Sequence, residues 1–300
     1  MKSQGDQRVD LAATLRSFWR RDNSPPVIGP CAGCLGAMGE NMPTGPIAAD
    51  WLTLAPEQAD EVPLRSWWAR PKFHQPRGAL LVLPEVFGVN PWVRSVADRW
   101  AQLGYGALAI PLFARTAPDL SLGYGPQELQ EGRSHKERTT SRTLLLEVAR
   151  AVRWLQSQGG ADGQPLAVGC IGFCFGGHVA LLASALEGVA ASCVCYGAGV
   201  VQGSPGGGPP TLEVLSRPGG RVLLIYGRED PLVPAEDLRA IATAVERAHT
   251  HEAGERAQLQ TFAAGHGFLC DARADFQPVE AEAAWGTITA FFAETLAEKD

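Results

Sequence analysis

The chain has 300 residues, of which 45% are hydrophobic and 19% are charged, and its formal net charge is -6. These values are ordinary for a globular protein and leave room for one large domain with an appendage. The acidic balance and the lack of a Lys/Arg run argue against nucleic acid or an anionic membrane as a partner, so we expect a small-molecule partner. Seven cysteines, an odd number, are typical of reduced thiols. Residues 1–19 contain no apolar signal segment, so we expect a cytoplasmic protein.

Residues 1–49 differ in composition from the rest of the chain, and we expect them to form an irregular N-terminal extension packed on the domain. They contain a short helical pattern over residues 11–19 and a run rich in Pro, Gly and Ser that holds Cys31 and Cys34. A C-x-x-C pair can bind a metal or cycle between redox states, but a metal needs a second ligand pair and a redox site needs a βαβ setting. Neither a second ligand pair nor a βαβ unit is adjacent to Cys31 and Cys34. We therefore predict no metal site, and a functional role of the two cysteines is the alternative interpretation.

From residue 50 onwards, apolar runs typical of strands alternate with amphipathic runs typical of helices. Strands are predicted over residues 64–69, 79–83, 105–110, 166–171, 190–196, 221–226 and 258–262, and helices over residues 93–103, 145–155, 175–186, 235–248 and 279–296. Buried strands that alternate with helices indicate a mostly parallel sheet with helices on both faces. Residues 50–300 are thus predicted to form one α/β domain, in which the charged cluster at residues 131–142 is a solvated, irregular surface.

The segment 166–186, LAVGCIGFCFGGHVALLASAL, has the pattern of a strand, a sharp turn and a helix. A residue at the apex of such a turn is forced towards positive φ, and its neighbours two positions away must be small, as Gly172 and Gly176 are. The apex residue is Cys174, which stands where the G-x-S-x-G nucleophile elbow has serine. Its position at a helix N-terminus favours a thiolate, so Cys174 is the predicted nucleophile. The alternatives are a buried structural cysteine and, because the segment carries no charge, a membrane span that its glycines disfavour.

Two further residues come after predicted strands in the same way. Asp230 comes after the strand at 221–226, and His266 comes after the strand at 258–262. Parallel strands place such loops at one edge of the sheet, and the order nucleophile, acid, histidine is that of α/β-hydrolases. Considered alone, His266 could be a structural residue with its hydrogen bonds satisfied, and Asp230 could simply form a turn before Pro231. Together with Cys174 they predict a catalytic triad, whereas His178 is expected to be a packing residue.

Five motifs carry a resemblance to a known family. They are LPEVFGVN at 83–90, PLFAR at 111–115, GFCFGG at 172–177, YGRED at 226–230 and AGHGF at 264–268. From about residue 50 to the C-terminus, the chain resembles the dienelactone hydrolases, or carboxymethylenebutenolidases. The resemblance implies an α/β-hydrolase fold and a triad of Cys174, Asp230 and His266.

The resemblance also implies roles for residues outside the triad. It assigns to Glu85 a contact with the thiol and to Arg115 a hold on the substrate carboxylate. A carboxylate near the thiol disfavours the thiolate, so we expect a mostly neutral resting thiol until substrate displaces Glu85. Where the founding enzymes carry a second arginine, four residues after the histidine, this chain has Cys270, and Arg273 is the candidate replacement.

The expected chemistry is hydrolysis of a lactone or carboxylic ester. Cys174 would attack the carbonyl to form a thiol-acyl enzyme, and His266 would activate the water that cleaves it. The backbone amides of Phe175 and Val86 are the predicted oxyanion hole. No cofactor is required, and the substrate carries a carboxylate if the arginines act as a clamp. The alternatives are a thioesterase or general carboxylesterase with the same site, and a non-catalytic hydrolase-fold protein that binds a small ligand.

Overall fold

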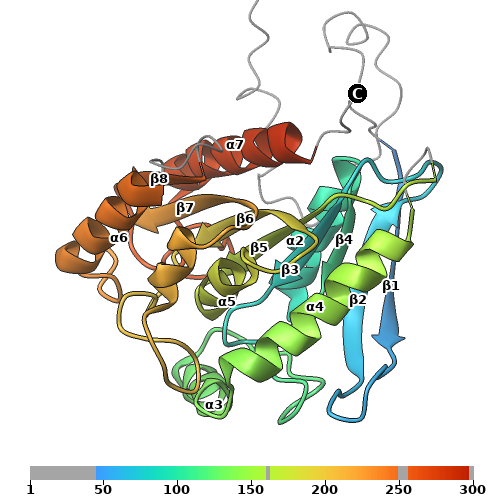
Figure 1. Cartoon of the computed structure of the whole chain (residues 1–300), viewed down its shortest axis with the longest axis horizontal. Helices are drawn as coiled ribbons and strands as arrows, with labels where there is room; N and C mark the ends of the chain where they lie inside the picture. The colour runs from blue at the N-terminus through green and yellow to red at the C-terminus, as the bar shows by residue number, and fades with distance from the viewer. Residues whose placement is uncertain (1–44, 160–162, 249–255, 297–300) are drawn as a thin grey trace, which may run out of the picture.

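The computed structural model describes residues 45–159, 163–248 and 256–296, and a single sheet runs through their centre (Figure 1). Its eight strands are β1 (Ile47–Leu54), β2 (Leu64–Pro71), β3 (Ala79–Leu83), β4 (Gly106–Ala109), β5 (Val168–Phe173), β6 (Val189–Cys195), β7 (Arg221–Gly227) and β8 (Ala257–Phe262). Their spatial order is β1-β2-β4-β3-β5-β6-β7-β8. Strands β1 and β2 pair in antiparallel fashion, β2 is also antiparallel to β4, and all pairs from β4 to β8 are parallel. The predicted mostly parallel sheet is confirmed.

Helices cover both faces of this sheet. They are α2 (Pro91–Gln102), α3 (Pro126–Lys136), α4 (Ser141–Ser157), α5 (Phe175–Ala183), α6 (Ala235–Ala248) and α7 (Pro278–Thr295), with a short 3-10 helix η1 (Thr211–Ser216). Helices α4, α5 and α6 pack on one face and α2 and α7 on the other (Figure 1). Successive strand residues point to opposite faces, so in β3 Leu81 belongs to the first core and Leu80 to the second. Because both faces are buried, the strand is a continuous apolar run.

Strand β1, helix α3 and the short 3-10 helix η1 were not predicted. Strand β1 begins at Ile47, before the boundary that the sequence suggested at residues 49 and 50; it is a half-exposed edge strand and lacks a clear apolar alternation. Residues 131–142, the charged cluster, were expected to be irregular. This expectation was wrong for residues 131–136, because they form the end of helix α3. Its one buried residue is Gly132, so it has no apolar stripe to reveal it.

The remaining part of the predicted extension, residues 1–44, lies outside the described residues, and so do its helical pattern and the pair of Cys31 and Cys34. Those expectations stay predictions. Within the described ranges, no helix is long and apolar enough to cross a membrane. The uncharged segment 166–186 instead forms β5 and α5, the latter a buried helix in the middle of the fold.

Candidate active site

Cys174 occupies a sharp turn between β5 and α5. Its φ of 53° lies in the left-handed region, which a non-glycine residue seldom adopts. Close packing on both sides holds this turn: a Cβ on Gly172 would lie 1.9 Å from the carbonyl oxygen of Gly176, and one on Gly176 would lie 2.1 Å from that of Leu83. The amide of Cys174 donates to the carbonyl of Cys195 at 3.0 Å. The backbone therefore has the form of a nucleophile elbow, and its partly exposed thiol stands at the start of α5.

His266 and Asp230 meet beside this turn. Nδ1 of His266 donates to Oδ2 of Asp230 at 2.7 Å, and both side chains are buried. The other oxygen of Asp230 accepts the amide of Leu232 at 2.8 Å, which fixes the carboxylate. Burial alone would lower the pKa of His266, but the neighbouring Cys174 and Asp230 raise it to about 10. Nε2 of His266 makes no hydrogen bond of normal geometry among the described residues, so this nitrogen is left for the thiol and for substrate.

Glu85 is almost completely buried in the turn after β3, and its partner is an arginine. Nη1 of Arg273 donates to Oε1 of Glu85 at 2.9 Å, and two other nitrogens of Arg273 donate to Asp275. Burial raises the pKa of Glu85, while the charges of Arg273 and His266 oppose that rise. Within the described chain, Oε2 of Glu85 has no hydrogen-bond partner. The structure thus places Glu85 against Arg273, and the expected contact with Cys174 is not among its hydrogen bonds.

The turn after His266 explains how Arg273 reaches Glu85. Cys270 stands where the resemblance led us to look for an arginine, and its side chain is fully buried. The amide of Arg273 donates to the carbonyl of Cys270 at 3.1 Å, so the chain turns back towards the site. The guanidinium lies 5.9 Å from the ring centroids of both Phe87 and Tyr124. Arg273 therefore places a cation next to Glu85, although it lies three residues after position 270, where the resemblance indicated an arginine.

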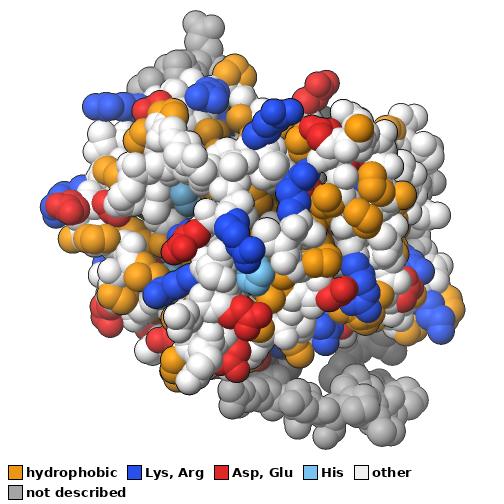
Figure 2. Space-filling view, turned by 90° about the horizontal axis from the view of Figure 1, so that it is seen from below, with side chains coloured by type: hydrophobic (Ala, Val, Ile, Leu, Met, Phe, Trp, Pro, Cys, Tyr) orange, Lys and Arg blue, Asp and Glu red, His pale blue; other side chains and the backbone are white. Residues whose placement is uncertain are grey.

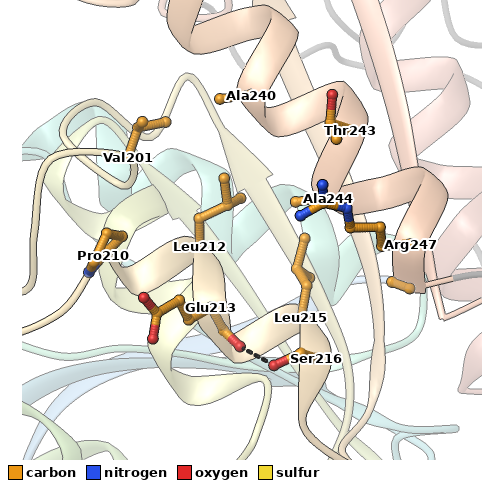
Figure 3. A pocket seen from close by; sticks show the side chains of 11 residues that line it. Val201, Pro210, Leu212, Glu213, Leu215, Ser216, Ala240, Thr243, Ala244 and Arg247 are labelled. Carbon is orange, nitrogen blue, oxygen red and sulfur yellow. Dashed lines mark hydrogen bonds between the residues drawn. The ribbon is translucent and has the colours of Figure 1, made fainter.

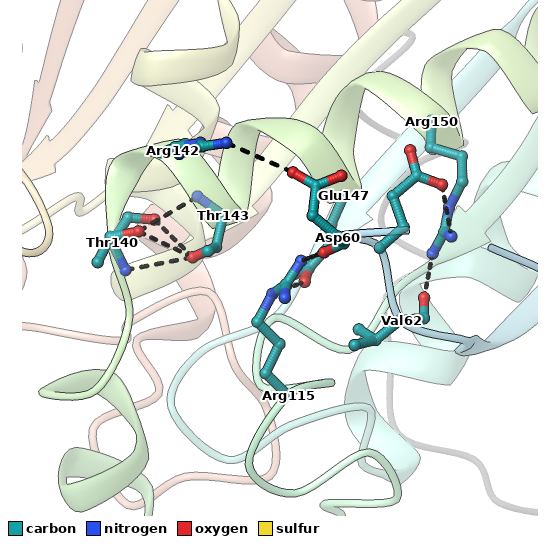
Figure 4. A network of polar contacts seen from close by, with 9 residues as sticks. Asp60, Val62, Arg115, Thr140, Arg142, Thr143, Glu147 and Arg150 are labelled. Carbon is teal, nitrogen blue, oxygen red and sulfur yellow. Dashed lines mark hydrogen bonds and ion pairs between the residues drawn. The ribbon is translucent and has the colours of Figure 1, made fainter. Parts of the chain in front are cut away.

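Arg115 is held by groups that the sequence did not indicate (Figure 4). Its Nε donates to Oε1 of Glu147 in α4 at 2.8 Å, and its Nη2 donates to the carbonyl of Asp60 at 2.6 Å. Glu147 is buried, whereas about a third of the Arg115 side chain is exposed. Two of the three guanidinium nitrogens are thus committed to the protein, which leaves Nη1 for any substrate contact.

A second ion pair lies beside the first and is fully buried. Nη1 of Arg150 in α4 donates to Oε2 of Glu61 at 3.1 Å, and each side chain is only 1% exposed. Arg150 also donates to the carbonyl of Ala55. It donates as well to the carbonyl of Val62, as Figure 4 shows. The pair of Arg150 and Glu61 links the connection between β1 and β2 directly to helix α4, and Arg115 bridges Asp60 in that connection to Glu147 in α4.

The buried carboxylate of Glu147 predicts a pH-dependent stability. Burial raises its pKa from an ordinary value of 4.5 to about 7, although Arg115 opposes the shift. Between these values the folded state binds more protons than the unfolded state, so stability falls as pH rises from 5 to 8. We expect Glu147→Gln to remove this loss. Between pH 5 and pH 8, the free energy of unfolding of wild type should fall by about 2 kcal/mol relative to that of Glu147→Gln. Urea unfolding at both pH values measures this difference. The control Glu236→Gln, at an exposed position, should show the same change in stability with pH as wild type. If Glu147→Gln also showed the wild-type change, the prediction would be contradicted.

The predicted oxyanion donors come from neighbouring strands. Val86 lies in the turn after β3, Phe175 opens α5 after β5, and the ends of the two strands pair at Leu83 and Gly172. Amides in the first turn of a helix have no acceptor within the helix. Since the amide of Cys174 already donates to another carbonyl, that of Phe175 is the first one free to bind an oxyanion.

Tyr196 is a site residue that the sequence analysis missed. It follows β6 with a φ of 41°, and its ring centroid lies 5.1 Å from that of His266. Its hydroxyl is buried and has no hydrogen-bond partner in the described part of the chain. A tyrosine at the end of a strand gives no recognisable signal. His178, by contrast, is buried with its ring nitrogens bonded to Ala198 and Thr211, and burial lowers its pKa to about 4, consistent with the expected structural role.

An apolar groove of about 680 Å³ lies away from these residues, between η1 and α6 (Figure 3). Leu212 and Leu215 line one side and Ala240 and Ala244 the other, and none of the predicted site residues borders it. No cluster of three or more His, Cys, Asp or Glu side chains within the described ranges has the arrangement of a metal site.

Comparison with known proteins matches most of the chain. The model of the dienelactone hydrolase family matches residues 64–296. The "Putative carboxymethylenebutenolidase" of Synechocystis sp. is 33% identical over 213 residues, 71% of this chain and 84% of that protein. The "Probable 2-oxo-3-(5-oxofuran-2-ylidene)propanoate lactonase" of Bradyrhizobium sp is 28% identical over 246 residues, 81% of this chain and 93% of that one. A solved structure titled as a "Putative Dienelactone Hydrolase" of Klebsiella pneumoniae has the same fold, with a TM-score of 0.71 and 24% identity over 83% of this chain and 100% of its own.

Proposed function

The chain belongs to the dienelactone hydrolase family, and from this premise we propose that it cleaves a lactone or carboxylic ester through a thiol-acyl intermediate on Cys174. One observation carries the proposal. Cys174 stands at a left-handed apex at the start of α5, and the hydrogen-bonded pair of His266 and Asp230 lies beside it. A nucleophile, a base and a group that orients the base are the parts that acyl transfer needs.

Each residue then has a defined role. The thiolate of Cys174 attacks the carbonyl carbon, and the amides of Phe175 and Val86 bind the oxyanion that develops. Protonated His266 gives its proton to the leaving oxygen as the carbon–oxygen bond breaks. The neutral imidazole then takes a proton from water, which attacks the thioester and releases the acid together with the free thiol. Asp230 stabilises the imidazolium at both stages.

The pair of Glu85 and Arg273 suggests how a carboxylate-bearing substrate is received. Both groups are largely buried, and a planar guanidinium suits a carboxylate because it donates two parallel hydrogen bonds. A substrate carboxylate would compete with Glu85 for Arg273. Arg115, with one nitrogen uncommitted, is the second cation of the proposal.

This arrangement predicts a change in the reactivity of the thiol. Glu85→Gln removes a buried negative charge and one of the two carboxylates paired with Arg273, so the thiolate of Cys174 becomes more favourable. We expect iodoacetamide to alkylate Cys174 roughly three- to tenfold faster at pH 7, as followed by mass spectrometry of its peptide. Asp275→Asn removes a charge on the exposed side of the same arginine and should change the rate little. An unchanged or slower rate in Glu85→Gln would show that Glu85 does not influence the thiol.

Hydrolysis of a dienelactone, p-nitrophenyl acetate and an acyl-CoA by wild type and by Cys174→Ala tests the proposed function. We expect the wild type to hydrolyse the lactone or the aryl ester, and Cys174→Ala to hydrolyse neither. Preference for the acyl-CoA would make the protein a thioesterase with the same site. No turnover of any of the three by a folded wild type would favour the non-catalytic, ligand-binding alternative.

A further inference from the structure

One face of α3 lies against both residues of the proposed oxyanion hole. Gly132 packs directly on Val86, since a Cβ at position 132 would lie 2.3 Å from the Val86 carbonyl oxygen. One helical turn later, Nζ of Lys136 lies 5.7 Å from the centroid of the Phe175 ring. Residues four apart share one face of a helix, so a single face of α3 contacts both Val86 and Phe175. Helix α3 thus lies beside the site at the lower end of the molecule in Figure 1.

Aromatic stacking fixes this end of α3. The ring of Phe113 stacks on His135 of α3 on one side and on Phe175 on the other, with 5.8 Å between centroids in each pair. The charge of Lys136 also affects a buried side chain of α5. Burial is the main cause of the lowered pKa of His178, and the ammonium of Lys136 lowers it further. Since His178 lies in the first turn of α5, the charge of Lys136 acts on this turn of the helix.

The charge of Lys136 is not neutralised by the protein. Arg273 is paired with Glu85 and Asp275, and Arg115 with Glu147, before any substrate arrives. The side-chain ammonium of Lys136 is exposed, and it makes no ion pair or hydrogen bond with the residues that the structure describes. Its contact with the Phe175 ring is a weak cation–π interaction at an exposed side chain, so an anionic group can draw the ammonium away from the ring.

Other charges at this end of the molecule do not form one attractive field. Figure 2 shows the molecule from below, and on this face Lys and Arg side chains are interspersed with Asp and Glu. Selection of an anionic substrate therefore depends on single, well-placed cations rather than on a broad potential.

We infer that Lys136 is a specificity-determining residue that favours substrates carrying a carboxylate or another anionic group close to the scissile ester. The inference rests on the proposed hydrolase function, and it adds a cation on α3 to the arginines considered above. In this role Lys136 leaves the face of Phe175 and pairs with the anionic group of the substrate, while the oxyanion amides hold the carbonyl.

The test compares two esters of equal acyl chain length that differ in charge. Mono-4-nitrophenyl glutarate carries a terminal carboxylate, and 4-nitrophenyl pentanoate does not. We expect Lys136→Gln to lower kcat/KM for the glutarate ester about fivefold, the scale of one partly solvated ion pair, and to change the pentanoate value less than twofold. The ratio of kcat/KM for the glutarate ester to that for the pentanoate ester should fall in wild type when NaCl is raised from 0.05 to 0.5 M. In Lys136→Gln the same increase in salt should change this ratio less.

Lys72 offers a matched control. Its Nζ lies 5.4 Å from the centroid of the Phe73 ring, so it is also an exposed lysine over an aromatic ring, but it follows β2 at the opposite edge of the parallel sheet. Lys72→Gln should leave both esters unchanged. Equal losses on the two esters in Lys136→Gln, or no loss on either, would overturn the assignment. If wild type hydrolyses neither of these esters, this inference fails, and the proposed function fails with it if the dienelactone and p-nitrophenyl acetate are not hydrolysed either. A neutral ester that is cleaved in a Cys174-dependent manner without charge preference refutes the inference alone.

Discussion

Replacing Cys174 by alanine is expected to lower kcat/KM for any ester substrate by at least about 10⁴-fold, because no other group can form the acyl-enzyme. His266→Ala should lose a comparable factor, since the imidazole transfers protons in both half-reactions. Triad residues act as a unit, so the double variant should be little worse than either single one. Steady-state assays on p-nitrophenyl acetate, corrected for spontaneous hydrolysis, measure all three.

Circular dichroism serves as the folding control, because the Cys174 side chain is small and partly exposed. Cys174→Ser is the sharper variant. It keeps the turn at φ 53° but presents a hydroxyl, which is far less acidic than a thiol, so acylation should also fall strongly. More than a trace of hydrolysis by folded Cys174→Ala would show that the nucleophile is another residue.

Gly176→Ala is expected to destabilise the fold by about 3 kcal/mol or more. The new Cβ would lie 2.1 Å from the Leu83 carbonyl oxygen and 2.5 Å from that of Pro84, and backbone atoms cannot move aside as a flexible side chain can. Either β3 and α5 separate or the elbow that holds Cys174 deforms. Activity should therefore fall together with stability, which urea unfolding followed by fluorescence and ester hydrolysis would measure.

Gly123→Ala is the matched control for this substitution. Its Cβ would meet nothing closer than a Glu128 side-chain oxygen at 3.8 Å, so it should change neither stability nor activity. If Gly176→Ala unfolded at the same urea concentration as wild type, the close approach of β3 and α5 would not be a constraint on this fold.

The parts of the fold that depend on short-range patterns could be predicted from the sequence. Strands buried on both faces are continuous apolar runs, and a helix with one buried side shows its period, so most of the parallel sheet and its covering helices were found. Strand β1 and helix α3 were missed because they are largely exposed: β1 is stabilised by pairing with β2, and α3 by a backbone contact at Gly132. Neither contact leaves a pattern in the chain.

The candidate site divides in the same way. The elbow and the order of Cys174, Asp230 and His266 are local features of the sequence, and the structure brings the last two within hydrogen-bond distance. The pairing of Arg115 with Glu147 and that of Arg273 with Glu85 could not be predicted, because in each pair the two residues are distant in the sequence. The expected cytoplasmic location, the lack of a nucleic-acid partner and the absence of a cofactor stay predictions.

The buried pair of Arg150 and Glu61 bears on where the folding unit begins. The family model starts at residue 64, yet the groups that accept hydrogen bonds from Arg150, on Ala55, Glu61 and Val62, all precede it. A fragment cut to the limits of the family match would keep the guanidinium of Arg150 but discard its ion-pair partner Glu61 and the two carbonyls that accept its hydrogen bonds, a loss that typically costs about 3–5 kcal/mol. The boundary of sequence similarity is therefore not a safe boundary for expressing this domain, and a sensible fragment retains the residues from Ala55 onwards.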